Sequence, residues 1–292
     1  MSILNRPSDG LLSVLLAVRR AIAAFGAMDE AKVIALCAPP SVVSEPDMIR
    51  KTITRWKQIG FFEDRNGKLD LAPGIASVAL DDLRSLRSEL LKLVLSQENN
   101  PWLSSDGTES KAGDWTRAAA WVLSQDLFSF PTDYAGVEAL QERQGVEPKV
   151  FANDTRWHGF VEWSAFLGIA WNWKSRTGTM FEPGFAVEAV LPSILRSAEQ
   201  IAMPDFLPRL AAVLPVIDSG IYADAVQQGL RRPWRTSRPD HLSPCLSAAL
   251  ARLEAGGVVR METRSDAPQV WLLGQSGRER RQISHIIRTG GG

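Results

Sequence analysis

The sequence has few of the residues that build redox, metal or nucleophilic sites. Its 292 residues include two cysteines and three histidines. Cys37 and Cys245 lie far apart, each in or at the end of an apolar helical pattern, so we expect buried free thiols rather than a disulfide or a ligand pair. The histidines, His158, His241 and His285, stand in separate contexts without the spacing of metal ligands. We therefore expect no metal site.

Motifs of enzymatic chemistry are also missing. The chain has no phosphate-binding glycine loop of the Walker or dinucleotide type and no Gly-x-Ser-x-Gly. The carboxylates of Asp81, Asp82 and Glu188 fit the surfaces of helices. A catalytic site assembled from residues far apart in sequence would leave no such motif, but nothing in this sequence proposes one. We expect a protein that is not an enzyme and that holds no cofactor.

Long hydrophobic runs are absent as well. No apolar stretch approaches the roughly 18 to 20 residues of a membrane span, and residues 1–7 lack the order of a signal peptide. We therefore expect a cytoplasmic protein with no membrane partner. The 45% of apolar residues is enough for real cores, and the length predicts two or three packed units.

The formal net charge of zero conceals an uneven distribution. Residues 1–73 have ten Lys and Arg against eight Asp and Glu, and residues 200–292 have twelve against eight. Residues 74–199 have eleven against seventeen. Basic ends suit phosphate backbones, whereas an acidic middle avoids them.

The clearest local pattern is a capped amphipathic helix followed by a hairpin in residues 44–71. Ser44 suits the N-cap, Pro46 the first turn and Gly60 the stop. At 100° per residue one side of this helix is apolar and the other basic. Asn66-Gly67 tolerates the positive φ of a tight turn between two short strands. With upstream helices at 11–25 and 29–37, the order predicts a winged helix.

In this module the helix would lie in the major groove of DNA, with the hairpin turn near phosphate. The residues predicted to contact DNA are Arg50, Lys51, Thr54, Arg55, Lys57, Gln58, Arg65 and Lys68. The alternatives are a solvated helix face and a winged helix that docks proteins, and nearby Asp47, Glu63 and Asp64 weaken the positive field.

The middle of the chain, residues 74–200, is predicted to be an acidic all-α domain, with helices that include one at 185–201 and with a loop or exposed linker at 97–113. It is rich in tryptophan, and the spacing of Phe160, Trp163, Leu167 and Ala170 favours core packing over an aromatic pocket. The tryptophans of this region are Trp102, Trp115, Trp121, Trp157, Trp163, Trp171 and Trp173.

Residues 201–275 repeat the opening pattern in outline. Two helices at 206–216 and 221–230 precede a helix that begins at Ser243-Pro244 and ends at Gly256-Gly257. Strands at 258–262 and 269–273 are predicted to pair as a hairpin around residues 264–268. We expect a second winged-helix-like domain, followed by a flexible basic tail at 276–292. The overall fold class is mainly α, with winged helices at both ends.

The third helix of this second module offers little to a phosphate. Its outward positions are predicted to be Ser247, Ala248, Ala251 and Arg252, which favours a protein contact. The charge lies instead in the preceding loop, where arginines flank a tryptophan and could clamp a backbone or stack on bases. The DNA-contacting residues predicted there are Arg231, Arg232, Arg235 and Arg238.

Two segments carry a resemblance to a known family. The start, Ile3-Leu4-Asn5-Arg6-Pro7-Ser8-Asp9-Gly10-Leu11-Leu12, and the segment 52–62, Thr-Ile-Thr-Arg-Trp-Lys-Gln-Ile-Gly-Phe-Phe, are similar to the DpdG family. This resemblance covers about the first 62 residues. The family is encoded in bacterial clusters that place deazapurine bases in DNA and restrict unmodified DNA. The resemblance implies an accessory subunit of an anti-phage restriction complex, with an ATPase, helicase or nuclease among its partners.

The first functional hypothesis is therefore a non-enzymatic adaptor that binds double-stranded DNA in a bacterial defence complex. The second is an interaction scaffold whose winged helices dock partner subunits and never touch DNA. A third, a transcriptional regulator with a helix-turn-helix, needs a symmetric dimer and a palindromic site.

Overall fold

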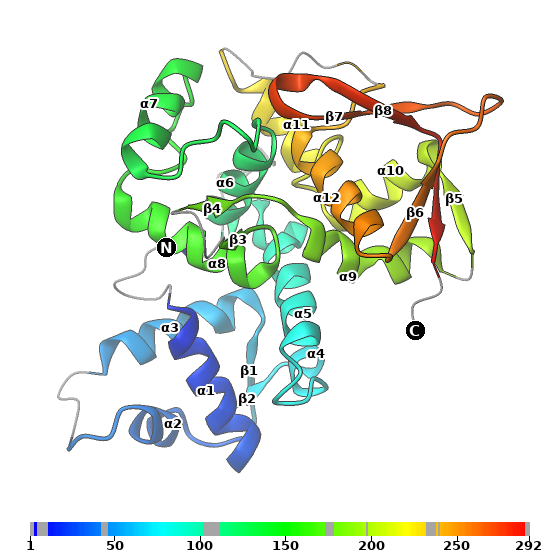
Figure 1. Cartoon of the computed structure of the whole chain (residues 1–292). Coiled ribbons are helices and arrows are strands. Elements are labelled where there is room, and N and C mark those ends of the chain that lie inside the picture. The colour runs from blue at the N-terminus through cyan, green and yellow to red at the C-terminus, as the bar shows by residue number, and fades with distance from the viewer. Residues whose placement is uncertain are drawn as a thin grey trace. The chain divides into compact units, whose positions relative to one another are not determined.

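A computed structural model describes residues 3–4, 11–41, 46–101, 111–172, 178–196, 198–231, 238 and 240–289. The fold is mainly α, with small antiparallel sheets (Figure 1). Contacts divide the chain into two compact units. Unit 1 comprises Met1–Trp115 and Asn153–Trp163, and unit 2 comprises Thr116–Ala152 and Ser164–Gly292. The predicted boundaries at residues 73, 200 and 275 remain predictions, because a compact unit need not fold alone.

Unit 1 begins with three helices and a hairpin in the predicted order. These elements are α1 (Leu12–Phe25), α2 (Glu30–Cys37), α3 (Asp47–Ile59), β1 (Phe62–Arg65) and β2 (Lys68–Leu71). They are followed by α4 (Pro73–Ala76), α5 (Leu83–Leu95), the 3₁₀ turn η1 (Gln97–Asn99) and parts of α6 (Gly113–Leu123) and α8 (Asp154–Leu167). The helix and hairpin predicted within 44–71 are therefore confirmed, whereas the proposed cap Ser44 lies outside the described residues.

The β1–β2 hairpin has the expected tight turn. Arg65 pairs with Lys68 across it, and Asn66 and Gly67 adopt φ of 56° and 77°. Both angles are positive, as a two-residue hairpin turn requires. On the other edge of β2, Met28 and Leu69 exchange backbone hydrogen bonds of 3.2 and 2.9 Å. The strand order is therefore Met28, β2, β1.

Aromatic side chains fill the core of unit 1. The ring of Trp56 on α3 lies 5.7 Å from that of Phe61 and 5.1 Å from that of Trp163. Phe160 lies 6.2 Å from Trp115 and 6.1 Å from Trp157. In unit 2, Trp121 is also fully buried. These tryptophans pack in cores, as the helical spacing predicted, while Trp102 and Trp173 lie outside the described residues.

Unit 2 contains helices and short strands. Its elements beyond the remainders of α6 and α8 are α7 (Tyr134–Gln144), β3 (Trp171–Asn172), β4 (Thr179–Met180), α9 (Gly184–Leu195), β5 (Gln200–Ala202), α10 (Met203–Val213), α11 (Ile221–Gln228), α12 (Pro244–Ala255), β6 (Val259–Glu262), β7 (Val270–Leu273), the 3₁₀ turn η3 (Gln275–Gly277), β8 (Glu279–Ile283) and β9 (His285–Arg288). The prediction of an all-α middle is wrong, because β3 pairs with β4. The helix expected over 185–201 ends at Leu195, since Arg196 takes a φ of 54°.

The C-terminal strands pair differently from the prediction. β6 pairs with β9 and β7 pairs with β8, so β6 and β7 do not form a hairpin together. The tight turn lies at 274–278, where Ser276 and Gly277 have φ of 56° and 71°. The order of the three-stranded sheet is β5, β9, β6 (Figure 1).

The predicted flexible tail is also incorrect. Glu279–Ile283 and His285–Arg288 are strands, and Ile283 and Ile286 are fully buried. These apolar side chains lie in the core of unit 2, while the neighbouring Arg280 and Arg281 face solvent. Among the described residues, no helix combines the length and the hydropathy that crossing a bilayer requires.

Candidate nucleic-acid interface

The exposed side of α3 is the candidate interface. Ile49, Ile53 and Trp56 anchor the helix in the core of unit 1. The opposite side leaves Arg50, Lys51, Thr54 and Gln58 exposed and Lys57 one-third exposed. Residues four apart lie one above the other on a helix, so residues 50, 54 and 58 form one row and Lys51 lies beside it. The predicted polar face is therefore present.

Arg55 does not belong to this face. Periodicity placed it outward, but the residue is only 1% exposed. Its guanidinium Nη1 donates to the carbonyl oxygen of Lys111 at 3.5 Å. This contact is with a segment more than fifty residues away, which helical periodicity does not report. Arg55 is unavailable to a duplex docked on the exposed side of α3.

Neighbouring carboxylates form ion pairs with three of the remaining cations. The Arg50 guanidinium lies 3.9 Å from the Asp47 carboxylate, and the Lys57 ammonium lies 3.9 Å from that of Asp64. Arg65, on the hairpin, donates to Glu63 at 2.7 Å and lies 2.9 Å from Asp70. The hydrogen bond to Glu63 and the charge of Asp70 raise the pKa of Arg65. Arg65 therefore points toward its own hairpin's carboxylates.

Two lysines differ from these paired cations. Within the described residues, Lys51 and Lys68 have no carboxylate within 4 Å, and both are exposed. On α3 and the hairpin, five exposed or partly exposed cations stand against the four carboxylates of Asp47, Glu63, Asp64 and Asp70. The face thus offers two free ammonium groups and the hydrogen-bonding side chains of Thr54 and Gln58, on a weak net positive charge.

The structure describes only part of the arginine-rich loop of unit 2. Arg231 and Arg238 are exposed, whereas Arg232 and Arg235 lie outside the described residues. The Arg238 guanidinium is 3.6 Å from the Glu279 carboxylate on β8. The same carboxylate lies 2.8 Å from His241 Nε2. Glu279 therefore ties the end of this loop to the β7–β8 ribbon.

Helix α12 has no exposed polar face comparable to that of α3. Ser247, predicted to face outward, is 3% exposed, and its Oγ accepts the backbone N–H of Leu273 on β7 at 2.9 Å. Arg252 donates to the buried carboxylate of Glu182 at 2.9 Å. Ala248 and Ala251 are half-buried. The predicted outward face of α12 is wrong, because the β7–β8 ribbon packs against this helix (Figure 1).

Two buried titratable groups lie on or beside α12, Cys245 and Glu182. Burial raises the pKa of Glu182, against the lowering effect of Arg252. Burial also raises the pKa of the Cys245 thiol, which makes it a poor nucleophile. Over the described ranges no group of three or more His, Cys, Asp and Glu side chains is placed to hold a metal ion.

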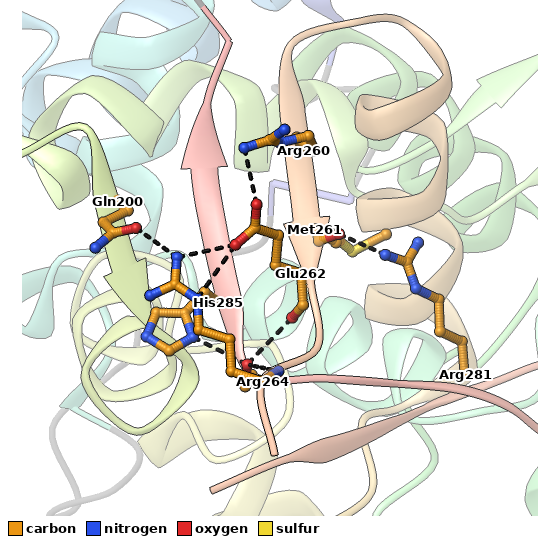
Figure 2. A network of polar contacts seen from close by, with 8 residues as sticks. Gln200, Arg260, Met261, Glu262, Arg264, Arg281 and His285 are labelled. Carbon is orange, nitrogen blue, oxygen red and sulfur yellow. Dashed lines mark hydrogen bonds and ion pairs between the residues drawn. The ribbon is translucent and has the colours of Figure 1, made fainter. Parts of the chain in front are cut away.

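Sequence reasoning missed a polar network on the three-stranded sheet of unit 2. Figure 2 shows the Glu262 carboxylate between two guanidiniums, Arg260 at 2.8 Å and Arg264 at 2.9 Å. Arg264 also donates to the side-chain oxygen of Gln200 at 2.7 Å. The hydrogen bond from Arg264 is the main cause that lowers the pKa of Glu262. The alternation Arg260-Met261-Glu262 could have indicated the ion pair, since alternate residues of a strand share a face and Arg260 and Glu262 are therefore neighbours.

Comparison with known protein families identifies a match. A family model described as DpdG-like matches residues 1–267. No curated protein matches the chain. No solved structure matches it.

Proposed function

Because the chain belongs to the DpdG-like family, which connects it with the Dpd modification system, we propose that it is a non-enzymatic DNA-binding adaptor of that system. In this role it binds double-stranded DNA and protein subunits of a restriction complex, such as an ATPase, helicase or nuclease. The observation that carries the DNA contact is the solvent-exposed side of α3, with Lys51, Thr54 and Gln58 available beside the hairpin.

The order of elements in unit 1 supports a winged helix. α1, the Met28 bridge, α2, α3, β1 and β2 follow one another, and Met28 and β1 lie on opposite edges of β2. In this arrangement the third helix is the recognition helix and the hairpin is the wing. A helix presented in this way enters the major groove, where its side chains reach phosphates and base edges.

The order in unit 2 supports a second module of the same kind. α9, β5, α10, α12, β6 and β9 follow one another, with α11 inserted before α12, and the sheet again places the last strand in the centre. The β7–β8 ribbon then forms an extended wing. Because this ribbon covers α12, we assign the second module a structural or protein-contacting role, not recognition of the major groove.

The experiment is a titration of a fluorescent DNA duplex with the full-length protein at several salt concentrations. We expect Lys51→Glu to weaken binding about tenfold and to reduce the slope of log affinity against log salt by about one, since one phosphate contact is lost. Arg20→Glu is the matched control, because Arg20 is exposed on α1 of the same unit and changes the charge equally. No duplex binding at low salt, or equal losses in the two variants, would contradict the proposal.

A second candidate function is a scaffold that docks partner subunits without touching DNA. The observation in its favour is the near balance of charge on α3 and the hairpin, where Asp47, Asp64 and Glu63 each lie beside a cation. This scaffold predicts no salt-dependent duplex binding at all. The titration above therefore separates the two candidates.

A further inference from the structure

Helix α2 is the least covered helix at the start of unit 1. Of its eight residues only Val33 is buried. Leu36 is 49% exposed, and Phe25, at the end of α1, is 69% exposed. Large apolar side chains left in water normally indicate a contact surface when they are grouped. Phe25 and Leu36 are grouped, because they line the same groove.

This groove is preformed. It has a volume of about 590 Å³ and is lined by Phe25, Ala27, Met28, Asp29, Lys32, Ala35, Leu36 and Lys68. The backbone of Met28 is fixed by the two hydrogen bonds with Leu69 on β2. One wall therefore belongs to the sheet and the other to α2. A fixed apolar groove costs little ordering entropy when it is filled.

The surface has a projecting aromatic ring, that of Phe25, as well as a groove. The ring of Phe25 is mostly exposed at the edge of the hollow that it helps to line. A two-fold axis places the same patch of two molecules face to face, so a knob beside a groove can meet a groove beside a knob. The shape of this patch is therefore self-complementary.

The charges of Asp29 and Lys32 on the rim are self-complementary across a two-fold axis as well. The Asp29 carboxylate and the Lys32 ammonium lie 3.7 Å apart, with exposed side chains. A partner with charges of one sign would meet a like charge here. A second copy related by a two-fold axis instead brings Asp29 of one molecule to Lys32 of the other, and Lys68 adds a second cation to the rim.

We propose that this groove is the contact surface for a second copy of the chain, with Phe25 of each copy in the groove of the other. The patch consists of one short helix, a loop and one aromatic side chain. Stable complexes bury about 1,200 to 2,000 Å² in total, so a patch of this size gives a weak, concentration-dependent dimer. The dimer doubles the number of α3 faces and of partner-binding surfaces in one assembly.

The first test is sedimentation equilibrium of the full-length protein over a range of concentrations. We expect a monomer–dimer equilibrium that Phe25→Glu and Leu36→Asp each weaken at least a hundredfold, because each places a carboxylate in the apolar contact. Ile221→Asp is the matched control, since Ile221 is 48% exposed in unit 2. A wild-type protein that stays monomeric, or a dimer that both groove variants leave intact, overturns the proposal.

The second test exchanges the rim charges. Asp29→Lys and Lys32→Asp each create like charges across the two-fold axis, so we expect each variant alone to self-associate about tenfold more weakly. An equimolar mixture of the two variants pairs opposite charges at both positions and should regain the wild-type affinity. A mixture no tighter than its components overturns the two-fold arrangement. Lys68, which lines the groove and also belongs to the candidate nucleic-acid interface, is left unchanged in all of these variants.

Discussion

Helices α3 and α12 each lead into a strand, β1 and β6 respectively, but they differ in what covers them. α3 keeps Lys51, Thr54 and Gln58 in solvent. On α12, Ser247 is buried under β7 and Arg252 is paired with Glu182. A similar order of helices and strands therefore does not guarantee a similar recognition surface. Under the function proposed above, exposure of this helix decides which unit can bind a duplex.

The difference in what covers α3 and α12 arises in the strands that follow each helix. In unit 1 the two strands are joined directly by Asn66-Gly67, so the hairpin is short. In unit 2 the chain between β6 and β9 includes β7, a second tight turn and β8. This additional ribbon extends beyond one end of the three-stranded sheet and packs on α12 (Figure 1). The extra strands of unit 2 therefore cover α12, whereas the short hairpin of unit 1 leaves one side of α3 in solvent.

The largest expected effect is at the buried ion pair of α12. We expect Arg252→Ala to destabilise the protein by about 3 kcal/mol at pH 7, because the buried Glu182 carboxylate loses its partner. Arg50→Ala on α3 is the control, and should cost less than about 0.5 kcal/mol because its ion pair with Asp47 is exposed. Denaturant unfolding measures both.

The same variant has a pH dependence of definite sign. Burial already raises the pKa of Glu182 in the folded state above its unfolded value. Such a carboxyl binds more protons when folded, so its contribution to stability falls as pH rises through the two pKa values. Arg252→Ala raises the folded pKa further. The loss of stability should therefore be smaller at pH 5 than at pH 7, and an equal loss at both would contradict a charged Glu182.

A smaller effect is expected where the ribbon meets α12. Ser247→Ala removes the acceptor of the Leu273 N–H and should cost about 1 to 2 kcal/mol, since a buried donor is left unpaired. Thr54→Ala, on the exposed side of α3, should be nearly neutral. Hydrogen exchange of the Leu273 amide gives a direct readout. Unchanged protection of that amide in Ser247→Ala would show that the ribbon is held by other contacts.

The smallest effects are expected at the two tight turns. Gly67 and Gly277 have φ of 77° and 71°, so Ala at either position should cost about 1 kcal/mol. Gly229→Ala is the control, because Gly229 has a φ of −79° that any residue adopts. Thermal unfolding of the three variants compares the turns. A neutral Gly277→Ala would contradict the C-terminal turn that replaces the predicted one.

Local signals explain why unit 1 was the more predictable part. Helix α3 depends on apolar spacing and on Gly60, and its hairpin depends on Asn66-Gly67, all within thirty residues. Contacts between residues far apart in sequence could not be predicted from such local patterns. Arg55 is buried and contacts Lys111, and no periodicity within α3 encodes that distant partner.

In unit 2 the turn of the hairpin differs from the predicted one, because β7 pairs with β8. Residues 264–268 contain Asp and Pro, which favour a turn, whereas Ser276-Gly277 precede a run of arginines that resembles a solvated tail. The strand partners of 279–288 include β5, which lies about eighty residues earlier. Pairing of that range is set by burial of Ile283 and Ile286, and their spacing is hidden among charged residues.

The most direct test of the contrast between α3 and α12 is thiol labelling with and without duplex DNA. Cys37→Ser provides the background, because the remaining Cys245 is buried. In it, Thr54→Cys should react rapidly and be protected by duplex at low salt, whereas Ser247→Cys should react slowly with or without DNA. Rapid labelling at 247, or duplex that protects 247 and leaves 54 unprotected, would contradict the assignment of α3 as the DNA-facing helix.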